Sequence, residues 1–288
     1  MTTATQMWST VAGGWERHAD FVEARGAHVT AAMADRTAPR PGERVLELAS
    51  GAGDVGLAVA PLVAPGEVVV SDVAAEMVEI AGRRAAARGL ENVTPRVFGV
   101  EAIDDQDASY DVVVCREGLM FAAEPEVAVR EIARVLRPGG RAAVAVWGPP
   151  ERNPWLRSVF EAVAGQLGRP VPPPGVRGPF SLADAGRLEQ LLAAELDDVE
   201  VDELDVPLEA GSFDEWWNRT AALAGPLAAI LAGLPDEATS AIEARLEEAV
   251  RPYRTAGGGL RFPGMALLGF GVLGEPGLRD PLLGAGQP

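Results

Sequence analysis

The stretch Val45-Leu46-Glu47-Leu48-Ala49-Ser50-Gly51-Ala52-Gly53-Asp54-Val55-Gly56 decides the fold of this chain. An apolar strand ends in an acid, turns through small residues and enters a helix rich in alanine, valine and leucine. Glycine permits positive φ and lets a ligand come close to the backbone. The free N–H groups that open the following helix make this end weakly electropositive. The stretch therefore predicts a strand–loop–helix unit whose turn binds a ligand.

Two features of the same stretch are typical of a dinucleotide site. Its glycines match G-x-G-x-x-G, and Asp72 follows Gly51 by 21 residues (72 − 51). However, Ala49-Ser50 separate the strand from the first glycine, and Glu47 lies inside the strand end. A carboxylate there suits a cationic aminopropyl group better than a pyrophosphate. Taken alone, the stretch leaves open which nucleotide binds, and a buried turn without a ligand is the alternative.

Composition narrows the possible functions. The 288 residues are 48% apolar, enough for a buried core, and carry a formal net charge of −17 without any lysine. A chain this acidic is repelled by nucleic acid and anionic membranes, and Schiff-base chemistry on lysine is excluded. The single cysteine, Cys115, excludes an intramolecular disulfide and a thiolate metal cluster. Neither a signal-like start nor an apolar run of spanning length is found, so we expect a cytoplasmic protein.

Apolar runs and turn signals predict alternating strands and helices. We expect one or two helices in 15–38 and a helix from the glycine turn to about residue 63. The predicted strands are 43–48, 67–72, 93–98, 110–115, 141–147, 199–206 and 260–272. The other predicted helices are 75–88, 125–136, 181–195 with Ser181 as N-cap, one that opens at the capping box Ser212 to Glu215, and further stretches up to 251. Continuous apolar strands between helices indicate an α/β fold with a parallel sheet covered on both faces.

Further motifs follow the opening stretch in a recognisable order. They are Asp72-x-x-x-x-Met77, Tyr110-Asp111-Val112-Val113, Gly118-Leu119-Met120-Phe121 and Arg134-Val135-Leu136-Arg137-Pro138-Gly139-Gly140. Together they resemble class I S-adenosylmethionine-dependent methyltransferases of the ubiquinone/menaquinone-type, small-molecule group (type 11-like), strongly over about residues 40–150. The resemblance implies a Rossmann-like, seven-stranded, mostly parallel sheet with the last strand antiparallel. It also implies helices on both faces and helical cap or lid segments.

The same resemblance suggests how the chain is divided. Residues 1–40 are expected to form an N-terminal helical cap and 41–150 the S-adenosylmethionine-binding core. Residues 151–273 would supply the rest of the sheet with helical substrate-cap insertions, and 274–288 a flexible tail. The expected partner is a small-molecule methyl acceptor, with no nucleic acid and no membrane insertion, and the protein is expected to be a monomer or homodimer.

The resemblance implies S-adenosylmethionine as the cofactor and assigns roles near the strand ends. Glu47 would reach the amino group of the methionine moiety, and Asp72 would accept both ribose hydroxyls, since one carboxylate offers two oxygens. The alternatives without a ligand are that Glu47 is a surface acid, that Asp72 is an acid at a helix N-terminus, and that Met77 is a core residue. Ala49, where glycine is usual, and Gly99, where an aspartate commonly binds adenine, depart from the pattern. The expected cofactor-binding residues are Glu47, Ala49, Gly51, Gly53, Asp72, Val73, Met77, Val100, Glu101 and Arg116.

Tryptophans gather on the expected acceptor side, and none of the six lies between residues 16 and 146. This distribution predicts an apolar or aromatic acceptor, with core packing of cap on sheet as the alternative. The candidate acceptor-binding residues are Trp15, Met120, Phe121, Trp147, Trp216 and Trp217.

Few residues can act as a general base. His18 and Glu117 are weak candidates, and a solvated surface histidine is the better interpretation of both His18 and His28. Arg116 would orient an anionic acceptor or simply neutralise Glu117. No metal site is expected. The sequence therefore predicts methylation of a small molecule at oxygen, carbon or nitrogen, in secondary metabolism or quinone chemistry. A nicotinamide-dependent oxidoreductase and a non-catalytic scaffold that keeps the fold are the alternatives.

Overall fold

A seven-stranded sheet forms the centre of the computed structural model, which describes residues 4–275 apart from the side chains of Pro226 and Ala229. The strand order is β3-β2-β1-β4-β5-β9-β6, and β9 runs antiparallel to both of its neighbours. The strands of this sheet are β1 (Arg44–Glu47), β2 (Glu67–Asp72), β3 (Val93–Val97), β4 (Tyr110–Arg116), β5 (Leu136–Trp147), β6 (Asp197–Asp205) and β9 (Met265–Val272). The predicted sheet with its antiparallel last strand is confirmed.

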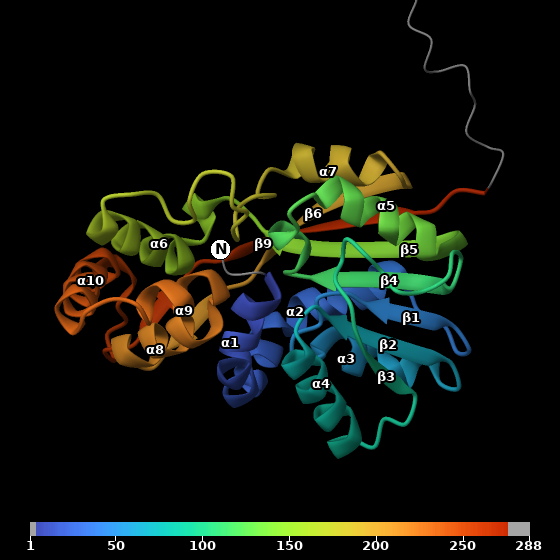
Figure 1. The fold of residues 1–288 in the computed structure, drawn as a ribbon, viewed down its shortest axis with the longest axis horizontal. Coiled ribbons are helices and arrows are strands. Elements are labelled where there is room, and N and C mark those ends of the chain that lie inside the picture. Colours follow the sequence, from blue (N-terminus) through green and yellow to red (C-terminus); the bar gives the residue numbers. More distant parts are fainter. Residues whose placement is uncertain (1–3, 276–288) are drawn as a thin grey trace, which may run out of the picture.

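Helices cover both faces of this sheet (Figure 1). One layer holds α2 (Ala19–Thr37), α3 (Asp54–Val63) and α4 (Ala75–Ala87), and the other holds α5 (Pro125–Val135) and α7 (Ala185–Ala193). The central strands are buried on both faces because their residues are apolar in unbroken runs such as Val68-Val69-Val70, each 0% exposed. The amphipathic helices then need only one apolar side each to close the core.

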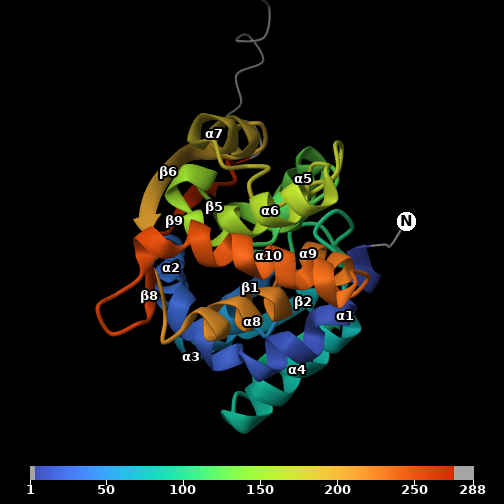
Figure 2. The ribbon, with the colours of Figure 1, turned by 90° about the vertical axis from the view of Figure 1, so that its left-hand side faces the viewer.

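A helical cap lies beyond the carboxyl ends of the parallel strands, on the left in Figure 1 and facing the viewer in Figure 2. It consists of α1 (Ala4–Arg17), α6 (Pro154–Leu167), α8 (Phe213–Leu223), α9 (Gly225–Leu231) and α10 (Asp236–Ala249), with a small hairpin of β7 (Leu208–Ala210) and β8 (Leu260–Phe262). Three short 3-10 turns lie in the connections: η1 (Leu119–Phe121) between β4 and α5, η2 (Pro150–Arg152) between β5 and α6, and η3 (Arg251–Tyr253) between α10 and β8.

Several details differ from the sequence prediction. The predicted strand 260–272 is broken at Pro263-Gly264, and its first part pairs with β7 in the cap instead of joining the sheet. Asp184, not Ser181, caps α7, since its side chain accepts the Arg187 N–H at 2.7 Å. Helix α6 was not predicted, and the tail prediction for 274–288 lies almost wholly outside the described residues.

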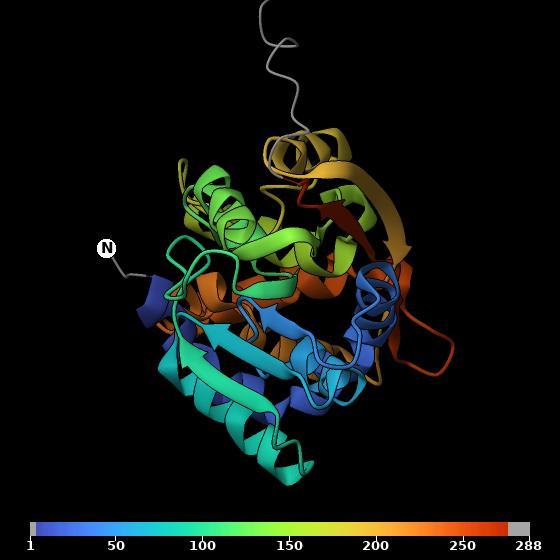
Figure 3. The same ribbon diagram turned by 90° about the vertical axis from the view of Figure 1, so that its right-hand side faces the viewer.

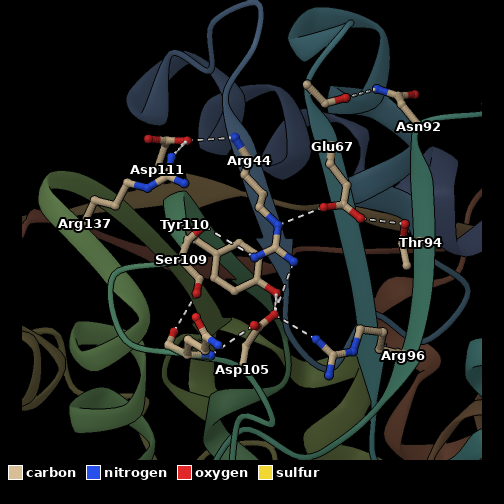
Figure 4. A network of polar contacts seen from close by, with 12 residues as sticks. Arg44, Glu67, Asn92, Thr94, Arg96, Asp105, Ser109, Tyr110, Asp111 and Arg137 are labelled. Carbon is tan, nitrogen blue, oxygen red and sulfur yellow. Dashed lines mark hydrogen bonds and ion pairs between the residues drawn. The ribbon is translucent and has the colours of Figure 1, made fainter.

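The opposite end of the sheet is held by a polar network (Figure 4). The Arg44 guanidinium at the start of β1 lies 4.4 Å from the Tyr110 ring centroid and binds Glu67 of β2 at 2.8 Å. Asp105 accepts the Tyr110 hydroxyl at 2.7 Å and Arg96 of β3 at 2.8 Å. Figure 3 shows these amino ends turned toward the viewer, with the cap helices behind the sheet. The network joins four strands far from the cap. The loops that follow β1 and β2 take no part in it and remain available for ligand binding.

Candidate functional site

One large cavity lies between the carboxyl ends of the strands and the cap. The glycine loop after β1, the acid at the end of β2 and the turn after β4 form its floor, while α1, α2, α6 and α8 form its roof and walls. Parallel α/β sheets place ligands at this edge, because the loops on either side of the first strand diverge there. The cavity has a polar end around Asp72 and an aromatic end around Trp147.

Asp72 is buried at the polar end, with 7% of its surface exposed. Its Oδ2 accepts the Gly51 N–H and its Oδ1 accepts the Ala74 N–H, each at 3.0 Å. Burial raises the pKa of this carboxyl, although the backbone amides of Ala74, Gly51 and Val73 oppose that effect. Asp72 lines the cavity and each of its oxygens can accept a further hydrogen bond, so the carboxylate can accept a pair of vicinal hydroxyls.

Glu47 is also buried, and its carboxylate is held by the first turn of α3. Its Oε1 accepts the Val55 N–H at 3.1 Å and its Oε2 the Gly56 N–H at 2.8 Å. A Cβ at Gly56 would lie 2.7 Å from Oε2, so glycine is required for this contact. Burial raises the pKa of Glu47 to about 8. The interpretation of Glu47 as a surface acid is wrong, because it is only 2% exposed and lines the cavity.

The loop between these acids turns through three residues of positive φ: Ala49 at 50°, Gly51 at 52° and Gly53 at 84°. Ala49 carries the strain of a left-handed conformation, which explains why glycine would suit this position. A Cβ on Gly51 would come within 3.0 Å of the Trp15 indole, so α1 closes the loop from above. Ser50 adds a buried Oγ that has no hydrogen-bond partner among the described residues.

A flat apolar slot adjoins Asp72. Val73, Met77, Gly99 and Val100 line it, together with Phe98, which the sequence analysis did not single out. Glu101 also lines the slot, but its Oε1 accepts the Glu124 N–H at 2.7 Å. A Cβ at Gly99 would have Val73 Cγ2 at 3.7 Å as its nearest neighbour, so the position has room for a side chain. The apolar side chains of this lining are of the kind that contact the face of a nucleobase.

Arg116 lies beneath this polar end within a network of buried charges. It donates to Asp54 at 2.5 Å and to Thr30 Oγ1 at 3.0 Å, and Asp54 also accepts Arg84 at 2.6 Å. Burial alone would lower the pKa of Arg116, but the nearby acids raise it. The direct partner of Glu117 is Arg25 at 2.7 Å, while Arg116 pairs with Asp54 and interacts with Glu117 only through its charge.

The aromatic end contains some of the predicted acceptor residues and excludes others. Trp15, Met120, Phe121 and Trp147 line the cavity. Trp216 and Trp217 do not, and this corrects the expectation for both. Trp216 is fully buried between Phe213 and Phe262 in the cap, and Trp217 donates to Glu243 at 2.8 Å. Lining residues absent from the predicted set are Trp8, Phe21, Arg25, Trp155, Phe160, Leu208 and Arg219.

The two candidate bases differ in position. His18 is outside the cavity lining, and burial beside Arg17 and Arg219 lowers its pKa. His28 is exposed, with Nδ1 3.4 Å from the Asp205 carbonyl oxygen. Glu117 lines the cavity at the turn after β4. Of the candidates, only Glu117 is placed to touch a bound molecule.

This geometry agrees with comparisons with known proteins. Residues 45–140, from β1 to the start of β5, match the family model described as a methyltransferase domain. This region of the chain is similar to methyltransferase domains. Over 124 residues the chain is 37% identical to a ubiquinone/menaquinone biosynthesis C-methyltransferase of Ectopseudomonas mendocina, covering 42% of this chain and 48% of that protein. It is 37% identical over 129 residues to a demethylmenaquinone methyltransferase of Thermus thermophilus, and this match covers 44% of this chain and 58% of that protein.

The chain thus spans about half the length of the curated relatives it matches. Among solved structures, the YcgJ protein of Bacillus subtilis aligns with a TM-score of 0.60 and 25% identity, over 86% of this chain and 99% of that one. The fold of this chain is therefore shared with a solved structure. Within residues 4–275, no helix combines the length and apolarity that crossing a membrane needs.

The cavity fits S-adenosylmethionine by its chemistry. The two oxygens of Asp72 would accept the ribose hydroxyls, the apolar lining beside Val73 would contact the adenine, and Glu47 and Ser50 would lie near the methionine moiety. The bound molecule would supply an electrophilic methyl group on a sulfonium. The chain would hold it, align the acceptor and exclude water.

Proposed function

We propose that the protein transfers the methyl group of S-adenosylmethionine to a small aromatic molecule. The carrying observation is the Asp72 carboxylate, which is buried under the glycine loop and has one amide on each oxygen. That arrangement prepares both oxygens for adjacent hydroxyls of a ribose. The relatives' names and the family model support the same activity.

The sheet topology supports methyl transfer over nicotinamide chemistry. The dinucleotide fold ends in a parallel strand with the order 3-2-1-4-5-6. Here β9 is inserted between β5 and β6 and is antiparallel to both. Burial favours the neutral form of Glu47, and a bound ammonium group would favour its ionised form, whereas a pyrophosphate would oppose ionisation.

The cavity walls support an aromatic acceptor. Trp147 and Trp155 pack edge to face with centroids 5.3 Å apart, and Phe21 and Phe160 line the same end. Aromatic walls bind flat apolar rings well. We propose a quinone-like or phenolic molecule, in line with the quinone-biosynthesis names of the relatives. A net charge of −17 argues against nucleic acid as acceptor.

The chain's contribution to the reaction would be alignment and the exclusion of water. Trp15 and Trp8 of α1 cover the glycine loop and Phe121, so a bound cofactor would be enclosed. The cap residues would then present the acceptor along the line of the sulfur–methyl bond. Residues 1–40 and the helical insertions within 151–273 would thus act as cap, and 41–150 as cofactor core, while the rest of 151–273 completes the sheet. We expect the protein to be a cytoplasmic monomer or homodimer.

Calorimetric titration of the purified protein with S-adenosylhomocysteine, and separately with NAD, tests this function. Micromolar binding of S-adenosylhomocysteine alone is expected, and it would lead to a screen of aromatic acceptors. Binding of neither compound would point to a scaffold that retains the fold. Binding of NAD alone would refute methyl transfer.

A further inference from the structure

Two buried side chains at the aromatic end have incomplete hydrogen bonding. Arg25 of α2 donates through Nη2 to Glu117 Oε2 at 2.7 Å, and the two side chains are only 8% and 11% exposed. Arg25 Nε and Glu117 Oε1 have no hydrogen-bond partner within residues 4–275. An unsatisfied buried polar atom costs about 1–3 kcal/mol. Two such atoms on adjacent side chains of one cavity wall therefore mark a place prepared for a ligand.

The positions of both groups are fixed by their surroundings. The Arg25 guanidinium lies 5.0 Å from the Trp147 ring centroid and 5.7 Å from that of Trp155. Glu117 has a φ of 58°, and its N–H donates to the Ala145 carbonyl at 2.7 Å. A left-handed conformation in a residue other than glycine is strained and is found preferentially at functional sites.

The close approach of α2 to β4 produces this pairing. A Cβ on Gly26 would lie 1.8 Å from Arg116 Nη1, so only glycine lets the helix descend this far. Consecutive residues Arg25-Gly26 consequently face the consecutive residues Arg116-Glu117. Sequence alone could not pair them, because they are about ninety positions apart (117 − 25 = 92).

Glu117 stands where the cofactor half meets the acceptor half. The next residue, Gly118, packs on the glycine loop so closely that a Cβ there would lie 2.4 Å from Ala49 Cβ. On the other side the cavity continues to Trp147 and Trp155. An acceptor atom bound to Glu117 is thus held beside the loop that binds the methyl donor.

We propose that Arg25 and Glu117 bind and activate the hydroxyl of an aromatic acceptor, an inference that rests on the proposed methyl transfer. One hydroxyl can donate a hydrogen bond to Glu117 Oε1 and accept one from Arg25 Nε–H, so it supplies the hydrogen-bond partner that each of these atoms lacks. Glu117 is then the general base and Arg25 stabilises the charge that develops on the oxygen. The acceptor class is a phenol, with its ring against the aromatic wall that Trp147 and Trp155 form.

The step balances in atoms and charge. The acceptor O–H bond breaks and its proton moves to Glu117 Oε1. The oxygen's electron pair forms the bond to the methyl carbon as the sulfonium–methyl bond breaks, with its electron pair left on sulfur. The products are an aryl methyl ether, a neutral thioether and a protonated Glu117, which returns its proton to solvent.

The test uses the protein saturated with S-adenosylhomocysteine, in which no turnover occurs. Calorimetry compares 2-naphthol with 2-methoxynaphthalene, its methyl ether, which lacks the hydroxyl proton. Wild type is expected to prefer 2-naphthol by at least tenfold. Glu117→Gln should abolish this preference with an unchanged affinity for S-adenosylhomocysteine, and Glu117→Asp, which keeps the carboxylate but shortens its reach, should retain part of it.

The matched control is Glu23→Gln, which breaks another arginine–glutamate pair of α2 outside the cavity, and it should keep the preference for 2-naphthol. A wild type that binds S-adenosylhomocysteine but binds the two probes equally overturns the proposal, as does a Glu117→Gln variant with wild-type preference. If Glu117→Gln fails to fold, Glu117→Asp decides, and full retention of the preference there also overturns it. Failure of S-adenosylhomocysteine to bind wild type would instead contradict the proposed function itself.

Discussion

Asp72→Asn separates the structural role of the cavity carboxylate from its binding role. Asparagine can accept the N–H of Gly51 or that of Ala74, but its amide NH₂ must then face the other N–H. One buried donor is left without an acceptor, which lowers the free energy of unfolding by about 1–3 kcal/mol. The variant also loses one acceptor for the ribose and the negative charge that strengthens the other. Losing one charge-assisted hydrogen bond of about 1.5–3 kcal/mol raises the dissociation constant of S-adenosylhomocysteine roughly 10- to 150-fold.

Asp111→Asn provides the matched control. Asp111 also accepts a backbone N–H, that of Arg44 at 2.8 Å, and it pairs with Arg137 at 2.6 Å, but it lies at the other end of the sheet (Figure 4). Urea denaturation should show a loss of stability in both variants, and calorimetry a loss of affinity in Asp72→Asn alone. An Asp72→Asn protein that is folded and binds S-adenosylhomocysteine within twofold of wild type would refute the assignment of the ribose to this carboxylate.

Three further variants test the cavity lining and the packing of α2 against it. Burial raises the pKa of Glu47 from 4.5 to about 8, so between these pH values the folded state retains a proton that the unfolded state loses. The free energy of unfolding should therefore fall from about pH 4.5 to about pH 8, by at most about 1.4 kcal/mol per pH unit. Urea denaturation of Glu47→Gln should show a flatter pH dependence of this free energy, and a slope identical to that of wild type would contradict the pKa shift. Gly26→Ala should lower the free energy of unfolding by about 1–3 kcal/mol, because its Cβ clashes with Arg116. Gly13→Ala, which has open space around its Cβ, should raise the free energy of unfolding by about 0.5–1 kcal/mol. Equal shifts of the melting temperature in the two variants would contradict this prediction. Gly99→Asp should fold normally, since its Cβ has room, and should bind S-adenosylhomocysteine more tightly through an added acceptor for the adenine amino group; weaker binding in calorimetry would show that adenine lies elsewhere.

The nucleotide half of the molecule could be read from the sequence because its signals are local. Strand β2 was predicted at the residues where it occurs, and the glycine loop and Asp72 lie where the spacing placed them. These features depend on residues close together in the chain and on a sheet order that short right-handed connections restrict. The antiparallel insertion of β9 followed from family resemblance and not from any periodicity.

The acceptor half could not be read in the same way. Arg25 and Glu117 meet only because α2 crosses β4 at Gly26, and no local pattern encodes that crossing. Trp216 and Trp217 were misplaced because a tryptophan pair in an amphipathic helix looks alike whether it faces a cavity or a core. Pro263-Gly264 divides what reads as one apolar strand, and the missing hairpin partner β7 is only three residues long.

The position of the tryptophans has a practical consequence for spectroscopy. Trp15 covers the glycine loop and Trp8 contacts Phe121, with ring centroids 5.1 Å apart, while Trp147 and Trp155 surround Arg25 at the other end. Indole emission responds to the polarity and quenching groups around the ring, so each end carries its own intrinsic optical label. Single Trp→Phe replacements would let stopped-flow fluorescence time the arrival of donor and acceptor separately, without an attached dye. The order in which the two substrates enter could thus be measured on the otherwise unmodified chain.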